Sequence, residues 1–503
     1  MREKYESLPL VQLKELAKVR GLKGTSTMKK AELVEAMLAE DERLKKEEEA
    51  KAAEQKQESA TETVRSEEPQ KQERSERPVR QERNYRPDRN YRGESAENVG
   101  VRSEAYTKER TFNPNNVAYD ESQYPKELDS GIEASGILEV MPDGYGFIRC
   151  ENYMPGENDV YVAPSQIRRF GLKTGDILKG NKRIKTQQEK FSALLFVKSI
   201  NGYTVEESSK RMAFEDMTPI FPDERIKMET PGCSIAMRVM DLVSPVGKGQ
   251  RGMIVSPPKA GKTTLLKEVA KSILRGNPKM HMLILLIDER PEEVTDIKEA
   301  IHGDNVEVIY STFDELPEHH KRVSEMVIER AKRLVEHKMD VVILLDSITR
   351  LTRAYNLVVP PSGRTLSGGL DPAALHMPKR FFGAARNMRE GGSLTILATA
   401  LVETGSKMDD VVYEEFKGTG NMEMVLDRKL SEKRIFPAID LAKSGTRRED
   451  LLLTPEELEA INIMRKALNG LKPDEATDRL LDMLAHTRNN VEFVNMVKKN
   501  HFI

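Results

Sequence analysis

The segment Ser256–Thr263, SPPKAGKT, decides the fold of the larger part of this chain. It follows a short apolar stretch, Gly252–Val255, and opens a helical pattern over Thr264–Ile273. A phosphate-binding loop requires this order of strand, loop and helix, because amides at the helix N-terminus and a lysine then converge on the phosphates. Ser256 stands where the usual pattern has glycine. This difference leaves the geometry of the turn undecided, but it does not change the expected phosphate chemistry. The segment predicts a P-loop.

Three residues of this loop have separate expected roles. Gly261 lets the backbone approach a phosphate closely. The ammonium group of Lys262 reaches the β- and γ-phosphates, and the Thr263 hydroxyl can ligate Mg²⁺. The expected cofactors are therefore ATP and Mg²⁺.

Two buried apolar strands after the P-loop end in carboxylates. Val341–Asp346 reads VVILLD, the Walker B form, and places Asp346 to hold the water shell of Mg²⁺. Leu283–Arg290 reads LILLIDER, and its Glu289 lies where hydrolysis needs a group that polarises the attacking water. One carboxylate at a strand end is more often a helix cap, but the three elements in this order predict nucleotide hydrolysis.

The pattern along the chain divides it into five parts. Apolar strands alternate with helical patterns over 246–503 and predict an α/β domain on a mainly parallel sheet. Five short alternating strands over 131–208 predict a small Greek-key barrel, and the proline-rich residues 209–245 are expected to connect the two domains. Residues 1–40 predict a small helical module, and residues 41–130 read as a linker.

The linker has a composition that predicts disorder. From Lys46 to Asn98 it contains no Ile, Leu, Met or Phe, so burial cannot offset the entropy of ordering it. From Lys71 to Arg92 a cation occurs at every third residue, which would line one edge of a polyproline II strand. Interspersed glutamates dilute this charge, and an RNA-binding arm and a solubilising spacer both stay open.

Composition limits the class of protein. A length of 503 residues corresponds to about three domains at roughly 150 residues each. The net charge of −2 means that a nucleic-acid surface has to be local. Two cysteines, Cys150 and Cys233, exclude a disulfide scaffold and a cysteine-type zinc cluster. The longest apolar run, Met282–Ile287, is too short for a bilayer, and no secretory signal is visible, so a cytoplasmic protein without a membrane partner is expected.

The barrel region carries a second functional signal in DGYGFIR, Asp143–Arg149. Alternation along a strand places Tyr145 and Phe147 on one face, and Arg149 continues that face. Such rings stack on bases while an arginine covers phosphate, which predicts binding of single-stranded nucleic acid. Rings that face the core of the barrel are the alternative, but small neighbours, Gly144 and Gly146, favour rings open to a ligand.

Later strands of the barrel can extend this site. Asp159 with Tyr161 on the next strand, and Glu189 with Phe191 on a later one, are expected to add base-edge acceptors and further rings.

These motifs together resemble the family of the bacterial transcription termination factor Rho. The resemblance rests on DGYGFIR, DVYVAPSQIRRF (159–170), PPKAGKT, LLIDERPEEV, LLDSITRLTRAYN and EEFKGTGNME. It covers 131–503 almost continuously and 1–40 more weakly, and it leaves out 41–130. It implies a multi-domain α/β chain with a RecA-type P-loop ATPase core, preceded by an OB-fold or cold-shock-like β-barrel and a small N-terminal helical module. It also implies a hexameric ring that acts as an RNA helicase and translocase.

The resemblance also assigns residues to the nucleotide site. Glu289 corresponds to the catalytic base, Arg447 to an arginine finger that reaches the neighbouring subunit, and Phe436 to the ring on adenine; Lys262 and Asp346 complete the catalytic set. The implied ATP contacts are Gly247, Lys248, Gly249, Gln250, Arg251, Gly252, Lys259, Ala260, Gly261, Lys262, Thr263, Thr264, Arg290 and Phe436. The implied Mg²⁺ ligands, through water, are Thr263 and Asp346.

Two RNA sites are implied in the same way. The primary site comprises Gly144, Tyr145, Gly146, Phe147, Ile148, Arg149, Asp159, Val160, Tyr161, Glu189, Lys190 and Phe191. The secondary site comprises two pore elements, PSGRTLSGG (361–369) and GSKMD (405–409), with the residues Arg364, Thr365, Leu366, Ser367, Gly368, Gly369 and Lys407. For either pore element alone, an ordinary flexible connection is the alternative.

The sequence therefore predicts an ATP-dependent RNA translocase that ends transcription by pulling on nascent RNA. The expected partners are single-stranded, pyrimidine-rich RNA, RNA polymerase with its elongation factors, and further copies of the chain in a homohexamer. A rotary or secretion-type RecA ring ATPase is the enzyme alternative, and an RNA-binding scaffold with a vestigial ATPase is the alternative from another class.

Overall fold

The computed structural model describes residues 126–186, 189–468 and 470–499, and six helical positions of the N-terminal part: Lys30, Ala31, Val34, Ala36, Leu38 and Ala39. The chain forms two compact units, Met1–Lys108 and Glu109–Ile503. Most of the expected linker, including its row of cations, lies outside the described residues. Its last residues, 126–130, already form η2 (Lys126–Leu128) and the start of β1, so the barrel begins before residue 131.

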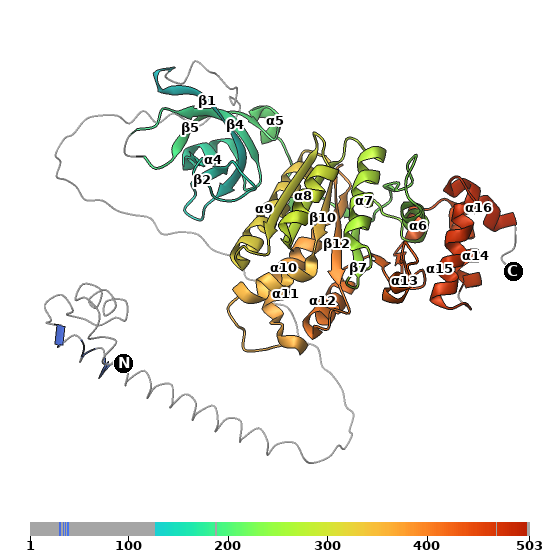
Figure 1. Cartoon of the computed structure of the whole chain (residues 1–503). Helices are drawn as coiled ribbons and strands as arrows, with labels where there is room; N and C mark the ends of the chain where they lie inside the picture. Colours follow the sequence, from blue (N-terminus) through green and yellow to red (C-terminus); the bar gives the residue numbers. More distant parts are fainter. Residues whose placement is uncertain are drawn as a thin grey trace, which may run out of the picture. The chain divides into compact units, whose positions relative to one another are not determined.

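Residues 129–200 form a closed five-stranded barrel, which confirms the fold predicted for this region (Figure 1). Its strands, paired in the order β1-β2-β3-β5-β4, are β1 (Asp129–Val140), β2 (Gly146–Arg149), β3 (Val160–Val162), β4 (Ile177–Arg183) and β5 (Ser192–Ile200). Two short helices, α4 (Pro164–Phe170) and α5 (Val205–Ser209), accompany them. The inward-facing side chains, among them Leu138, Ile148 and Val160, are fully buried in one apolar core.

The α/β domain is built on a nine-stranded sheet whose main path is β14-β13-β7-β12-β10-β8-β9. The six strands from β13 to β9 are parallel, as the apolar runs predicted. The strands of the path are β7 (Arg251–Ser256), β8 (His281–Glu289), β9 (Val306–Thr312), β10 (Asp340–Asp346), β12 (Ser393–Leu401), β13 (Met422–Val425) and β14 (Gly445–Thr446). At the side of the path, β6 (Pro219–Ile220) pairs with β11 (Arg386–Met388), which pairs with β12.

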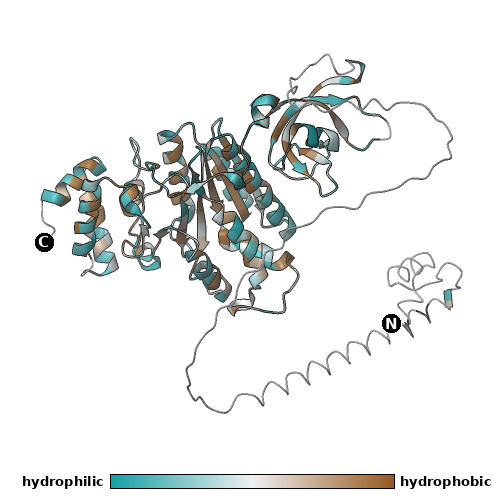
Figure 2. Ribbon diagram, turned by 180° about the vertical axis from the view of Figure 1, so that it is seen from behind, coloured by the Kyte–Doolittle hydropathy of each residue, from teal (hydrophilic) through white to brown (hydrophobic). Residues whose placement is uncertain are grey.

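Helices cover both faces of this sheet, and the strands are accordingly buried on both faces (Figures 1 and 2). Along β10, Val342 and Leu344 pack into one core while Val341, Ile343 and Leu345 pack into the other. The first core takes in α6 (Ile235–Val243), α7 (Lys262–Gly276), α8 (Pro291–Ala300), α14 (Pro455–Leu468), α15 (Pro473–Ala485) and α16 (Asn490–Lys499). The second takes in α9 (Pro317–Glu336), α10 (Ile348–Val358), α11 (Pro372–Gly383) and α12 (Lys407–Lys417).

The expected connector 209–245 belongs largely to the α/β domain, which corrects the domain boundary. Phe214 at the start of η3 (Phe214–Asp216) is buried in the second core, β6 pairs in the sheet, and α6 packs in the first core. Prolines in this stretch mark the turns between these short elements and not a free linker. Among the described residues, no helix combines the length and apolar character needed to cross a bilayer.

Candidate nucleotide and RNA sites

The P-loop lies at the carboxyl edge of the parallel sheet, between the end of β7 and the start of α7. Gly261 caps α7 with a φ of 92°, a left-handed conformation that favours glycine. Ser256 is fully buried, and its hydroxyl donates a hydrogen bond to the Pro257 carbonyl at 2.9 Å. The structure therefore accommodates serine at the position where the usual motif has glycine.

The predicted catalytic side chains meet at this edge. Lys262 Nζ lies 2.9 Å from Glu289 Oε1 and 2.5 Å from Asp346 Oδ1. They come from α7, β8 and β10, and β8 and β10 are neighbouring parallel strands whose carboxyl ends lie side by side. The hydroxyl of Thr399, on β12, also donates to Asp346 at 2.6 Å. Carboxylate and hydroxyl oxygens are the donors that Mg²⁺ prefers, so Asp346 and Thr263 fit that ion.

The electrostatics of this cluster suit proton transfer near neutral pH. Burial, and then the negative charge of Asp346, raise the pKa of Glu289 to about 7, while Lys262 lowers it in part. Burial works against the charged form of Lys262, but the two carboxylates outweigh it and raise the pKa of Lys262. A carboxylate with a pKa close to the working pH is well matched to a general base.

Sequence reasoning missed two residues of this cluster, Thr399 on β12 and Arg350 on α10. The Arg350 guanidinium forms an ion pair with Asp288 at 2.8 Å, and its Nε lies 3.6 Å from the Glu289 carboxylate. Arg350 follows Asp346 by four residues, so the first turn of α10 returns it to the edge of the sheet. A cation one helical turn after the Walker B carboxylate was the available signal.

A cavity of about 560 Å³ adjoins the P-loop and is large enough for part of a nucleotide. Its lining brings together five of the residues assigned to ATP: Lys259, Ala260, Gly261, Thr264 and Phe436. The Phe436 ring is half exposed, which leaves a face for stacking. Arg290 is also exposed and caps the N-terminus of α8 directly after Glu289.

The predicted ATP contacts at 247–252 do not line the P-loop cavity of their own chain. These residues lie at the start of β7 and the P-loop follows its end, which separates them by roughly 20 Å at the usual rise per residue. Gly249 N–H donates to Thr395, the Gln250 amide to Asn421, and the Arg251 guanidinium to the Thr419 carbonyl. Lys248 pairs with two carboxylates, Glu224 and Asp340. Within one subunit these residues therefore form hydrogen bonds and ion pairs at the amino edge of the sheet.

Arg447 lies at that amino edge too. Its backbone N–H donates to the Asn421 carbonyl, and Asn421 N–H donates to Arg251 at the start of β7. The side chain is exposed and lines a cavity of about 960 Å³ with Glu423 and Arg465. Arg447 therefore lies far from the P-loop of its own chain.

The barrel gathers four aromatic rings into one partly exposed patch. The rings belong to Tyr145, Phe147, Tyr161 and Phe191, and the contacting ring centroids are 5.2–6.0 Å apart. Phe147 on β2 is paired with Tyr161 on β3, which explains their closeness. Glu189, Lys190 and Phe191 precede β5 in a loop and are not on a strand as predicted.

Several other residues assigned to RNA in the barrel are buried in the chain without RNA, and their contact with RNA stays a prediction. Arg149 and Asp159 form a buried ion pair, and Arg149 also binds Glu139 at 2.6 Å. The Arg149 guanidinium carbon lies 4.8 Å from the Phe147 ring centroid, so it supports that ring from within. Arg149 therefore does not face the solvent where a phosphate would approach.

The small and apolar members of the motif have packing roles. Ile148 and Val160 are fully buried in the barrel core. A Cβ on Gly146 would lie 2.8 Å from the Leu138 side chain, so this glycine is required by close packing and not by an open ring face. Gly144 has a φ of 84° and open space around it, as a turn before β2 requires.

The two predicted pore elements lie against each other at the carboxyl edge of the sheet. A Cβ on Gly368, in η4 (Ser367–Gly369), would lie 2.5 Å from the backbone nitrogen of Met408. Arg364, Thr365 and Ser367 are exposed, and Leu366 and Gly369 flank them in the same segment. Lys407 is exposed as the first residue of α12, not within a loop as predicted.

Models of known protein families match three parts of this chain. Family models match at 4–41 (Rho termination factor, N-terminal domain), 134–206 (Rho termination factor, RNA-binding domain) and 236–446 (ATP synthase alpha/beta family, nucleotide-binding domain). The solved structure of an ATPase from a type III secretion system of pathogenic bacteria covers 63% of this chain and 94% of its own, with 20% identity and a TM-score of 0.49.

Curated relatives extend the match over most of the chain. Transcription termination factor Rho of Pseudomonas aeruginosa is 57% identical over 381 residues, which are 74% of this chain and 90% of the relative. The protein of that name from Bacillus subtilis is 56% identical over 374 residues, 74% of this chain and 86% of the relative. A rotary or secretion ATPase is therefore not favoured, and the chain belongs to the transcription termination factor Rho family.

Proposed function

We propose that this chain hydrolyses ATP to move along single-stranded RNA and so releases the transcript from RNA polymerase. The observation that carries the proposal is the meeting of Lys262, Glu289 and Asp346 at a P-loop, in a chain that also presents an aromatic patch on a barrel. A vestigial ATPase would have no reason to keep a buried base with a pKa of about 7 beside the P-loop lysine.

In the proposed reaction the phosphates of ATP take Lys262 away from its two carboxylates. Glu289 then orients the attacking water and accepts its proton, and Arg350 holds the carboxylate in place. The residues that would hold Mg²⁺ are Thr263 and Asp346; that ion neutralises charge on the β- and γ-phosphate oxygens when it is bound. Phe436 stacks on the adenine ring from the wall of the cavity.

The position of Arg447 supports a site shared between subunits. An arginine at the opposite edge of the sheet cannot reach the P-loop of its own chain, but it can reach that of a neighbour in a ring. We therefore assign Arg447 as a finger that acts in trans within a homohexamer.

RNA is proposed to occupy two sites in turn. Bases of single-stranded, pyrimidine-rich RNA are proposed to stack on the exposed faces of the patch formed by Tyr145, Phe147, Tyr161 and Phe191. The strand then reaches the paired elements that carry Arg364 and Lys407, whose exposed cations contact its phosphates.

ATP hydrolysis with and without cytidine-rich RNA, together with the mass of the assembled protein, tests this function. We expect strong stimulation by the RNA and the mass of six chains. ATP binding without stimulated turnover would favour a scaffold, and turnover that ignores RNA would favour another kind of ring ATPase.

Separate variants are expected to distinguish the two RNA sites. Phe147→Ala should weaken RNA loading by about 1–3 kcal/mol, the usual contribution of one base–aromatic stack, and leave nucleotide binding without RNA unchanged. Lys407→Ala should retain loading but lose stimulation of ATP hydrolysis. RNA affinity and stimulated turnover are measured for each variant.

Lys271→Ala, which removes an exposed cation from α7, is the matched control for Lys407→Ala and should behave as the unaltered chain. Equal loss of RNA loading in the Phe147 and Lys407 variants would contradict the assignment of two sites.

A further inference from the structure

The barrel docks on the α/β domain through helix α9 and the edge strand β9. At the turn before β4, a Cβ on Gly175 would lie 2.4 Å from the backbone of Glu329 in α9, and its φ is 95°. Only glycine allows this approach of two backbones. The Asn152 side chain accepts from the Tyr310 N–H and donates to the Tyr310 carbonyl, and so closes part of the β9 edge.

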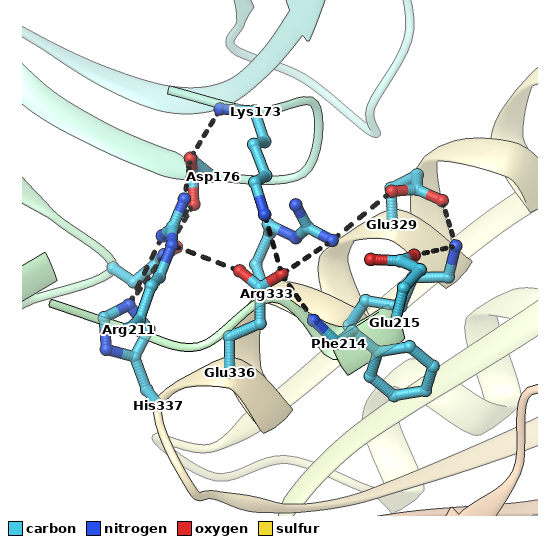
Figure 3. Close-up of polar contacts among 11 residues, drawn as sticks. Lys173, Asp176, Arg211, Phe214, Glu215, Glu329, Arg333, Glu336 and His337 are labelled. Atoms are coloured by element: carbon cyan, nitrogen blue, oxygen red, sulfur yellow. Dashed lines mark hydrogen bonds and ion pairs between the residues drawn. The ribbon is translucent and has the colours of Figure 1, made fainter. Parts of the chain in front are cut away.

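A buried group of three charges fastens this contact (Figure 3). The Arg211 guanidinium donates to both oxygens of Asp176 in the barrel, at 2.6 and 2.7 Å. Its Nε lies 3.1 Å from Glu336 at the end of α9. The two carboxylates are completely buried and Arg211 is 7% exposed. We call Arg211, Asp176 and Glu336 the clasp.

Further donors surround the two carboxylates of the clasp. Glu336 also accepts from Lys173 at 3.2 Å and from the Phe214 N–H at 3.0 Å, and it forms an ion pair with Arg333 at 3.1 Å. Asp176 also accepts from the Lys173 N–H at 2.8 Å and from the Asn201 amide at 2.8 Å. Removing charges from water is costly, and an apolar cluster of similar size would often stabilise the fold equally well. What this arrangement adds is one defined orientation of the two domains.

The chain itself gives little control over that orientation. α5 ends at Ser209 on the barrel, and Phe214 is already anchored in the core of the α/β domain, so only 210–213 join them. Within the described residues the chain crosses the junction once, with Arg211 in the middle of the crossing. The clasp acts beside the other contacts of this junction, among them the Asn152–Tyr310 hydrogen bonds and the packing of Ile137 in the second core, and 210–213 is the segment about which the barrel would turn if the junction loosened.

A second contact ties the aromatic patch itself to α9. The Glu139 carboxylate binds Arg149, which lies under the Phe147 ring, and it accepts from Arg322 of α9 at 2.7 Å on both oxygens. The ring that is proposed to stack on RNA is therefore connected through two arginines and a carboxylate to the helix that carries Glu336.

We propose that the clasp is a positioning device for RNA-dependent ATP hydrolysis, an inference that rests on the proposed function. The clasp holds the barrel in one orientation, so that RNA leaving the aromatic patch is delivered to the elements that carry Arg364 and Lys407. A rigid connection raises the effective concentration of RNA at the second site, and a swinging barrel would lower it. Arg211, Asp176 and Glu336 touch neither RNA nor ATP and act only through this orientation.

The test is a triple variant of the full chain, Arg211→Met, Asp176→Asn and Glu336→Gln. It removes the three charges together, so that none of the three is left buried without its partner, and the buried Arg333 keeps its ion pair with Glu329 at 3.7 Å. Loading is measured with a cytidine oligonucleotide too short to reach the second site, without ATP. Coupling is measured as the concentration of long cytidine-rich RNA that gives half-maximal ATP hydrolysis.

We expect the affinity for the short oligonucleotide and the turnover at saturating RNA to stay within about twofold, while the half-saturating RNA concentration rises at least about tenfold. Arg211→Lys, which keeps the charge but not the fork of donors, should give a smaller shift in the same direction. The Arg211→Lys variant tests the clasp whether or not the triple variant folds. The matched control is Lys198→Met with Glu133→Gln, an exposed ion pair of the barrel away from the junction, which should change none of the three quantities.

An unchanged half-saturating concentration in both clasp variants would overturn the inference. So would a parallel loss of oligonucleotide affinity, because the clasp would then only maintain the fold of the barrel. If the unaltered chain itself showed no RNA-stimulated hydrolysis, the proposed function would fail instead, and the two failures are thus distinguished.

Discussion

Glu289→Gln is expected to lower RNA-stimulated ATP turnover by about two to four orders of magnitude, the usual contribution of a general base. The glutamine amide fills the same space beside Lys262 and Asp346 but cannot accept a proton from water. ATP should still bind, because the P-loop and the cavity beside Phe436 are unchanged. Turnover and ATP affinity measured on the same preparation separate the two effects.

The pH dependence gives this prediction a second readout. Because the pKa of Glu289 is raised to about 7, the base is protonated below that pH and becomes active as the pH rises through it. The kcat/KM of the unaltered chain for ATP should therefore increase with pH up to about 7 and then level, and Glu289→Gln should lose that limb. Glu292→Gln, an exposed acid in the first turn of α8, serves as the control. Near-normal turnover in Glu289→Gln would remove this residue from the mechanism.

The sheet and the site at its carboxyl edge could be predicted because their signals are local. VVILLD and LILLIDER are apolar on both faces, as strands covered by helices on each side must be, and both are β-strands of the sheet. Once the strands are parallel, their final carboxylates have to share one edge with the P-loop. The meeting of Glu289, Asp346 and Lys262 therefore followed from the pattern alone.

Sequence reasoning could not place a residue in space where its partner lies far away in the sequence. Alternation placed Arg149 near the rings, but it could not reveal that Glu139 and Asp159 neutralise and bury its charge. The segment 247–252 is close to the P-loop in sequence, yet a strand of six residues separates the two in space. The clasp joins 176, 211 and 336, and no spacing in the sequence marks such a triad.

Arg447→Ala is expected to suppress ATP hydrolysis by about three to five orders of magnitude, the contribution of an arginine finger in phosphoryl transfer. Folding and the nucleotide affinity of one subunit should stay nearly intact, since Arg447 is exposed and distant from its own P-loop. The variant loses stabilisation of the transition state, because the finger contacts negative charge that develops on the γ-phosphate of a neighbouring site during the reaction. Arg448→Ala removes the adjacent exposed arginine, which pairs with Asp450, and is the matched control.

Mixed rings decide whether this arginine acts in trans. A subunit with Arg447→Ala keeps an intact Lys262, and a subunit with Lys262→Ala keeps an intact Arg447. In a mixed ring, some Arg447→Ala subunits have a Lys262→Ala subunit as the neighbour that supplies the finger. The intact Lys262 site then receives an intact Arg447, so mixing two inactive variants should restore part of the hydrolysis. If mass measurements confirmed mixed rings and no activity returned, the assignment of Arg447 as a finger that acts in trans would be wrong.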